Sequence, residues 1–128
     1  MKAERFEDLD IWKLSRELVK SIYNITTKAE FTRDYGFINQ IQRCSVSIMS
    51  NIAEGFERKG NKEFIHFLSI AKGSCGELRS QLYIALDLGY INEGDFQNNM
   101  ESAERISGSI SSLIKYLESY NLKLNQKP

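Results

Sequence analysis

Apolar residues recur at intervals of three and four along most of the chain, a spacing that predicts helices. Short stretches rich in glycine, asparagine, aspartate and lysine interrupt this pattern. No run of alternating apolar and polar residues competes with it. We therefore predict four helices, over residues 8–29, 37–58, 62–88 and 93–118, followed by a polar tail over 119–128.

Each predicted helix carries an apolar stripe that would face a shared core. Trp12, Val19 and Tyr23 add a second apolar flank to the first helix. That flank either widens the buried face or is covered by another subunit, since tryptophan is enriched at interfaces. The predicted inward residues, helix by helix, are Ile11, Ser15, Leu18, Ile22 and Ile25; Phe37, Ile41, Cys44, Ile48, Ile52 and Phe56; Phe64, Leu68, Ala71, Cys75, Leu78, Leu82 and Leu86; and Phe96, Met100, Ala103, Ile106, Ile110, Leu113 and Leu117.

Long helices joined by short connections predict an all-α fold, an antiparallel up-down-up-down four-helix bundle that forms a single domain over residues 1–128. The one proline is Pro128, so no proline interrupts a helix. Gly89 is expected to end the third helix in a left-handed conformation, and Asn92 to cap the fourth. Gly73 and Gly76 within the third helix predict a close backbone approach, with glycines that a long helix merely tolerates as the alternative. Ser50 and Gly55 in the second helix are further places where another backbone could come close.

The stretch CSVSIMSNIAEGFE, residues 44–57, offers two different helix faces. Beside its apolar stripe runs a polar one, and the third helix has a comparable flank next to its own core stripe. We predict a hydrogen-bonded polar seam at a subunit interface, with a solvated face as the alternative. The predicted interface residues are Arg43, Ser47, Asn51, Glu54, Phe67, Ser74 and Glu77.

Charge limits the classes of partner. Seventeen basic residues balance seventeen acidic ones, and the pI is near 6.6. Neutrality argues against a general nucleic-acid binder, whose affinity depends on a dense basic surface. A local patch at Arg58, Lys59 and Lys62 remains a candidate nucleic-acid site, and an ordinary mixed surface is its alternative.

The sequence lacks the residues that most catalytic sites need. It contains one histidine, His66, which falls away from the core stripe, so neither a Ser-His-Asp triad nor a histidine metal set is expected. Cys44 and Cys75 both fall on core stripes and are expected to be buried thiols. We predict a protein that is not an enzyme and holds no cofactor or metal.

The location of the protein can also be predicted. The first ten residues carry charges where a signal peptide would be apolar, and no apolar run approaches the length of a membrane span. A cytoplasmic protein with no membrane partner is expected.

Three segments closely resemble one bacterial family. They are FEDLDIWKLS, FINQIQRCSVSIMSNIAEGFER and NKEFIHFLSIAKGSCGEL, and QLYIALDLGYI follows the last of them. The combination of SIMSNIAEG with KEFIHFLSIAKGS is specific, and the chain is identified as a member of the four-helix-bundle family encoded in intervening sequences of 23S rRNA genes, the S23 ribosomal protein-like family.

The resemblance implies a four-helix bundle that assembles with itself as a homopentamer. A related branch, the accessory variability protein of diversity-generating retroelements, is a pentameric bundle that binds nucleic acid. RNA is therefore one candidate partner, and another protein is the alternative.

Overall fold

The structure of the protein, a computed structural model, describes residues 3–125, with side chains described for residues 3–120. The described residues include no strand, which confirms the predicted all-α class. In chain order the elements are η1 (Phe6–Asp8), a short 3-10 helix, and the α-helices α1 (Asp10–Ile25), α2 (Tyr35–Glu57), α3 (Asn61–Asp87) and α4 (Glu93–Asn125).

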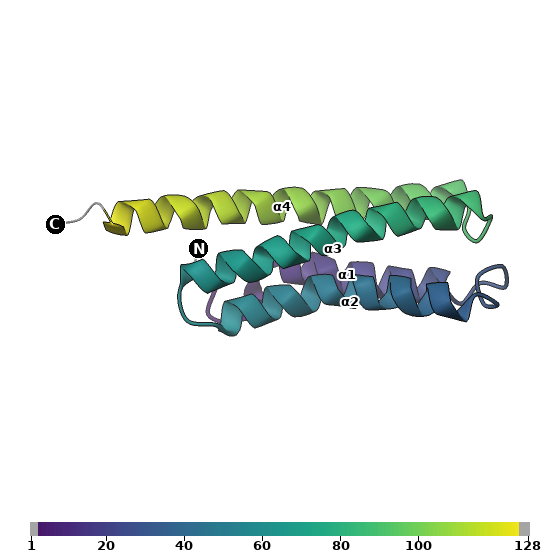
Figure 1. Ribbon diagram of the computed structural model, residues 1–128, viewed down its shortest axis with the longest axis horizontal. Helices are drawn as coiled ribbons and strands as arrows, with labels where there is room; N and C mark the ends of the chain where they lie inside the picture. The colour runs from purple at the N-terminus through teal and green to yellow at the C-terminus, as the bar shows by residue number, and fades with distance from the viewer. Residues whose placement is uncertain (1–2, 126–128) are drawn as a thin grey trace.

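The four helices lie side by side along one long axis, and successive helices run in opposite directions (Figure 1). Within the described residues, the backbone of α1 lies close to those of α2 and α4, and the backbone of α3 lies close to the same two helices, but α1 and α3 have no close backbone approach. The helices therefore sit at the corners of a square, with α1 diagonal to α3.

One continuous hydrophobic core runs along the centre of this bundle. All predicted inward residues of α1 are buried, as are nearly all of those on the other three helices. The exceptions are Phe56, Leu86 and Leu113, which are half-buried at the edge of the core. Phe56 lies beside Gly55, the residue that faces α3 at this level, and its ring stands edge-on to that of Phe64 at 5.8 Å.

Gly55 marks a close approach between α2 and α3. A Cβ atom at this position would lie 2.7 Å from Cβ of Phe67 and 3.3 Å from the carbonyl oxygen of Phe64. Gly73 and Gly76, where the sequence predicted such an approach, are instead exposed, and a Cβ at either would have no neighbour within 4 Å. That prediction was wrong because both glycines lie on the outer face of α3.

The first helix is shorter than predicted and ends at Ile25. The hydroxyl groups of Thr26 and Thr27 donate to the carbonyl oxygens of Tyr23 and Asn24. Such side-chain hydrogen bonds compete with the backbone hydrogen bonds that would continue the helix. The turns that follow bury Phe31 completely at the end of the bundle. A polar-looking loop thus supplies a core residue.

The connection between α3 and α4 follows the predicted chemistry. Gly89 has a φ of 74°, its amide donates to Leu86 at 3.0 Å, and the amide of Tyr90 donates to Ala85 at 2.9 Å. This pair of hydrogen bonds is the Schellman motif, which glycine permits at low cost. Asn92 then accepts a 2.7 Å hydrogen bond from the amide of Asp95, as a helix cap should.

The last helix continues beyond its predicted end, through Asn125. Ile114 and Leu117 still pack on the core, and the sequence offers no glycine or proline between Gly108 and Pro128 to stop the helix. Most of the predicted tail is therefore helical, and residues 126–128 lie outside the described residues.

Candidate interaction surfaces

The centre of the predicted polar seam forms between α2 and α3. The hydroxyl oxygens of Ser47 and Ser74 lie 3.0 Å apart and share a hydrogen bond. The side-chain amide of Asn51 donates to both the carbonyl oxygen and the hydroxyl of Ser47, at 2.8 and 3.0 Å. The thiol of Cys44 donates to the carbonyl oxygen of Ser74 at 3.2 Å. These polar groups satisfy one another within a single chain.

The cysteines beneath this seam are buried and free, as predicted. Burial, with a further contribution from the Glu77 carboxylate, raises the pKa of Cys44 from its ordinary value to about 12. Burial also raises the pKa of Cys75 to about 11, against the opposing charges of Lys72 and Arg79. Neither thiol forms a nucleophilic thiolate near neutral pH.

A second polar cluster, centred on Arg58, lies where α2 connects to α3. The guanidinium of Arg58 donates to Glu54 at 2.9 Å, lies 3.9 Å from a carboxylate oxygen of Glu63, and stacks 5.0 Å above the ring of Phe67. Arg58 thus joins the end of α2 to the start of α3 and covers the half-buried Phe67 ring. Its cation is already neutralised by carboxylates of its own chain.

The predicted interface residues therefore divide into separate groups. Ser47, Asn51 and Ser74 meet in the seam, and Glu54 and Phe67 meet at Arg58. Arg43 and Glu77 are exposed along the same two helices.

Apolar residues extend this surface beyond the seven predicted interface residues. Ile70, Ile84 and Leu88 are 40%, 45% and 56% exposed. With Phe67, Ser74, Glu77 and Gln81 they form a second stripe on α3 that has the same three- and four-residue spacing as the core stripe but is shifted by one residue. We call these seven residues the outer stripe. The shifted repeat was visible in the sequence and could have identified the whole stripe.

The predicted basic patch is only partly available. Arg58 is paired as described above, whereas Lys59 and Lys62 are exposed and form no ion pair or hydrogen bond with any described residue. Two of the three predicted cations can therefore meet an anion from outside.

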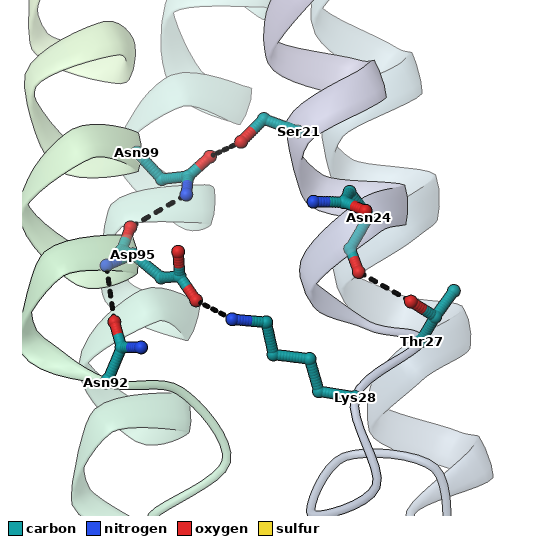
Figure 2. Close-up of polar contacts among 7 residues, drawn as sticks. All are labelled: Ser21, Asn24, Thr27, Lys28, Asn92, Asp95 and Asn99. Carbon is teal, nitrogen blue, oxygen red and sulfur yellow. Dashed lines mark hydrogen bonds and ion pairs between the residues drawn. The ribbon is translucent and has the colours of Figure 1, made fainter.

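A polar network between α1 and α4 was not predicted (Figure 2). The hydroxyl of Ser21 donates to the side-chain oxygen of Asn99 at 2.8 Å, and the Asn99 amide donates to the carbonyl oxygen of Asp95 at 2.7 Å. Lys28, on the loop after α1, pairs with the Asp95 carboxylate. Asn99 is 2% exposed. Asn99 lies three residues after Phe96 and four before Ala103 of the core stripe, and this spacing was an available signal.

Reactive groups do not gather elsewhere in the described chain. His66 is exposed, and its ring stands against that of Phe67 at 5.4 Å. Within residues 3–125 no three acidic, histidine or cysteine side chains are placed to hold a metal ion. None of the described helices has an apolar stretch long enough to cross a bilayer.

Comparison with known proteins identifies the family of the chain. Its sequence matches the model of the 23S rRNA-intervening sequence protein family over residues 7–112. The fold is similar to the crystal structure of a protein of unknown function from the S23 ribosomal protein family of Bacteroides thetaiotaomicron VPI-5482, with a TM-score of 0.76 and 24% identity over 82% of this chain and 95% of that one. The comparison with curated proteins gives no match. The chain belongs to the 23S rRNA-intervening sequence protein family.

Proposed function

We propose that the protein is a non-enzymatic scaffold that assembles into a homopentamer and binds RNA weakly. In the proposed assembly, the outer stripe on α3 of one copy contacts the α1 flank of the next. The number five comes from the resemblance to the family, and the choice of surfaces comes from the contacts described above.

One observation carries the proposal for self-assembly: the outer stripe exposes apolar side chains beside the seam, where Ser47, Asn51 and Ser74 already have hydrogen-bond partners. At about 100° per residue, Ile70, Ile84 and Leu88 lie within about 40° of one another on α3. The neighbouring seam, with Ser47 and Ser74, has its hydrogen bonds made within the chain. Covering this face therefore buries apolar area without leaving those polar groups unpaired.

The position of α1 supports a ring rather than a two-fold dimer. Trp12 and Val19 are half-buried and Tyr23 is 43% exposed, so the α1 flank keeps apolar area at the surface. Because α1 is diagonal to α3, the two surfaces belong to opposite corners of the bundle. A contact between two different surfaces is head-to-tail, and such contacts generate rings when the rotation closes.

The proposal for weak RNA binding rests on Lys59 and Lys62, which are exposed cations without a carboxylate partner among the described residues. In a ring, five copies of this pair would add their phosphate contacts by avidity. Zero net charge favours the alternative, an adaptor that binds only protein. The absence of catalysis is also part of the proposal, supported by the buried thiols and by His66, which stands against Phe67 rather than a nucleophile.

Light scattering tests the assembly. The wild-type protein should have a mass of five times the 14.8 kDa chain. Ile70→Glu combined with Ile84→Glu places charge on the outer stripe and should give monomers of unchanged helicity. Tyr35→Glu is the matched control, because Tyr35 is 79% exposed at the start of α2 and outside both proposed surfaces. An unchanged mass in the double variant would remove the outer stripe from the interface.

Binding of labelled structured RNA at low and near-physiological salt tests the second part. Lys59→Glu with Lys62→Glu should abolish binding and leave the assembly intact, whereas Lys20→Glu, on an exposed part of α1, should bind like the wild type. Equal binding by both variants would exclude the lysine pair. No wild-type binding at either salt concentration, with nuclease-insensitive recovery of a protein partner, would favour the adaptor.

A further inference from the structure

The second half of α4 carries two exposed tyrosines that lie outside both surfaces of the proposed assembly. Tyr116 and Tyr120 are 49% and 46% exposed and lie about one helical turn apart, on the same face. Figure 1 shows that α4 runs past the beginning of α3 at this end of the bundle. The two rings, with Leu117 and Asn61, line a hollow of about 210 Å³. Tyrosine, unlike leucine, offers a flat ring with a polar edge.

The same hollow adjoins the available cations. Asn61 begins α3 and is followed directly by Lys62, and Lys59 lies two residues before it. Both lysines are exposed and unpaired, whereas the nearby Arg58 is held by Glu54 and Glu63. This end of the bundle therefore presents two aromatic rings, one amide side chain and two free positive charges together.

We propose that this end of the bundle binds an unpaired stretch of RNA, with a base stacked on Tyr116 or Tyr120 and the adjoining phosphates on Lys59 and Lys62. The proposal rests on the RNA binding proposed above and specifies its substrate class and site. Single-stranded nucleic acids are held in this way, by aromatic platforms beside a positive surface. In a duplex the bases are stacked on one another and cannot reach the rings.

A nucleotide satisfies both features of the site at once, because each one carries a π face and a negative charge. An acidic peptide would pair with the lysines but leave the rings without a stacking partner. The family match ends at residue 112, so both tyrosines lie beyond it. The aromatic half of the site therefore lies outside the matched family region, whereas Lys59 and Lys62 lie within it.

Fluorescence anisotropy with a labelled single-stranded oligoribonucleotide, and with a blunt-ended two-strand duplex of the same length, tests the proposal on the full chain. The wild type should prefer the single strand. Tyr116→Leu with Tyr120→Leu should weaken that binding by about 5- to 150-fold, the range that one aromatic–base stack contributes. Tyr116→Phe with Tyr120→Phe should retain it, because the rings remain. Tyr35→Leu is the control at the opposite end of the bundle.

The salt dependence separates the lysines from the tyrosines. Each phosphate contact in a single strand contributes about 0.7 to the slope of log K against log salt. Lys59→Ala with Lys62→Ala should therefore reduce the slope by about 1.4, and the tyrosine variants should leave it unchanged.

The outcomes distinguish this proposal from the one it rests on. Equal binding of single strand and duplex, with no effect of the leucine variants, overturns the tyrosine site and leaves weak RNA binding in place. Absence of binding to either RNA overturns both. Loss of a protein partner in the leucine variants, with RNA binding unaffected, would assign the tyrosines to protein recognition instead.

Discussion

The hydroxyl group of Tyr90 donates a 2.9 Å hydrogen bond to Oδ2 of Asp34. The other carboxylate oxygen of Asp34 accepts the amide of Phe37 at 3.2 Å and so caps α2. One carboxylate therefore connects the α3–α4 turn to the beginning of α2. The ring of Tyr90 also lies 5.0 Å from that of the buried Phe31. These contacts hold together the end of the bundle at which the α1–α2 connection and the α3–α4 turn both lie.

The Tyr90–Asp34 bond predicts a pH-dependent stability. The hydrogen bond to Asp34, followed by burial and the negative charge of Asp34, raises the pKa of Tyr90 above its ordinary value. A raised folded-state pKa stabilises the fold fully below the unfolded value of about 10, and this stabilisation is lost as pH rises through the folded value. Tyr90→Phe should lower the free energy of unfolding at neutral pH and reduce its decline at alkaline pH.

Urea unfolding across a pH series measures this effect. Tyr83→Phe is the matched control, because Tyr83 is 52% exposed and makes its described contact through its ring, against Phe96. Parallel alkaline curves for the wild type and Tyr90→Phe would contradict the prediction.

Replacing glycine by alanine should lower the stability of the fold at Gly55, which faces α3, and raise it at Gly73, on the outer face of α3. Gly55→Ala places a Cβ 2.7 Å from that of Phe67, so α2 and α3 must separate, and we expect a loss of about 1–3 kcal/mol. Gly73→Ala adds a Cβ to open space within α3 and should stabilise the fold by about 1 kcal/mol. Chemical denaturation of both variants measures the difference. Equal stabilities would show that the close approach at Gly55 relaxes without cost.

The contrast between these glycines shows what sequence reasoning could reach. Three- and four-residue spacing predicted the helices and most of the core, because that spacing reflects which face each helix buries. It named Gly55 as a place of close approach, which the structure confirms, but it named Gly73 and Gly76 as well, since choosing among them depends on how two helices are rotated against each other. Likewise, Phe31 lies in a loop without periodicity, so its complete burial depended on tertiary packing.

The candidate surfaces were predictable to a similar degree. The polar residues of the seam were identified from their shared stripe, and Ser47, Asn51 and Ser74 do meet. Only the side-chain geometry of the structure could show that the hydrogen bonds of the seam form within one chain. The pairing of Arg58 with two carboxylates also required this geometry, and this pairing leaves only Lys59 and Lys62 of the predicted patch available.

The thiols should be unreactive in the folded protein. The pKa values of about 12 for Cys44 and about 11 for Cys75 keep both protonated at pH 8, and burial limits access. A disulfide reagent should react about 100-fold or more slowly with the folded chain than with the urea-unfolded chain, whose thiols have pKa values of about 8.5. The single variants Cys44→Ala and Cys75→Ala report each thiol separately. Rapid modification of either under native conditions would mean that α2 and α3 separate readily.

The α1–α4 network should contribute cooperative stability through the buried Asn99. Asn99→Ala removes the acceptor of Ser21 and the amide that bonds to the Asp95 carbonyl, at an expected cost of about 1–3 kcal/mol. Ser21→Ala removes the same Ser21–Asn99 bond from the other side, so the double variant should lose less than the two single losses combined. Urea unfolding of the four proteins in this cycle gives the coupling energy.

Ser102→Ala is the control, because its exposed hydroxyl donates only to its own helix, and the change should stay within about 0.5 kcal/mol. Strictly additive losses at Ser21 and Asn99 would show that the bond between α1 and α4 adds no stability of its own.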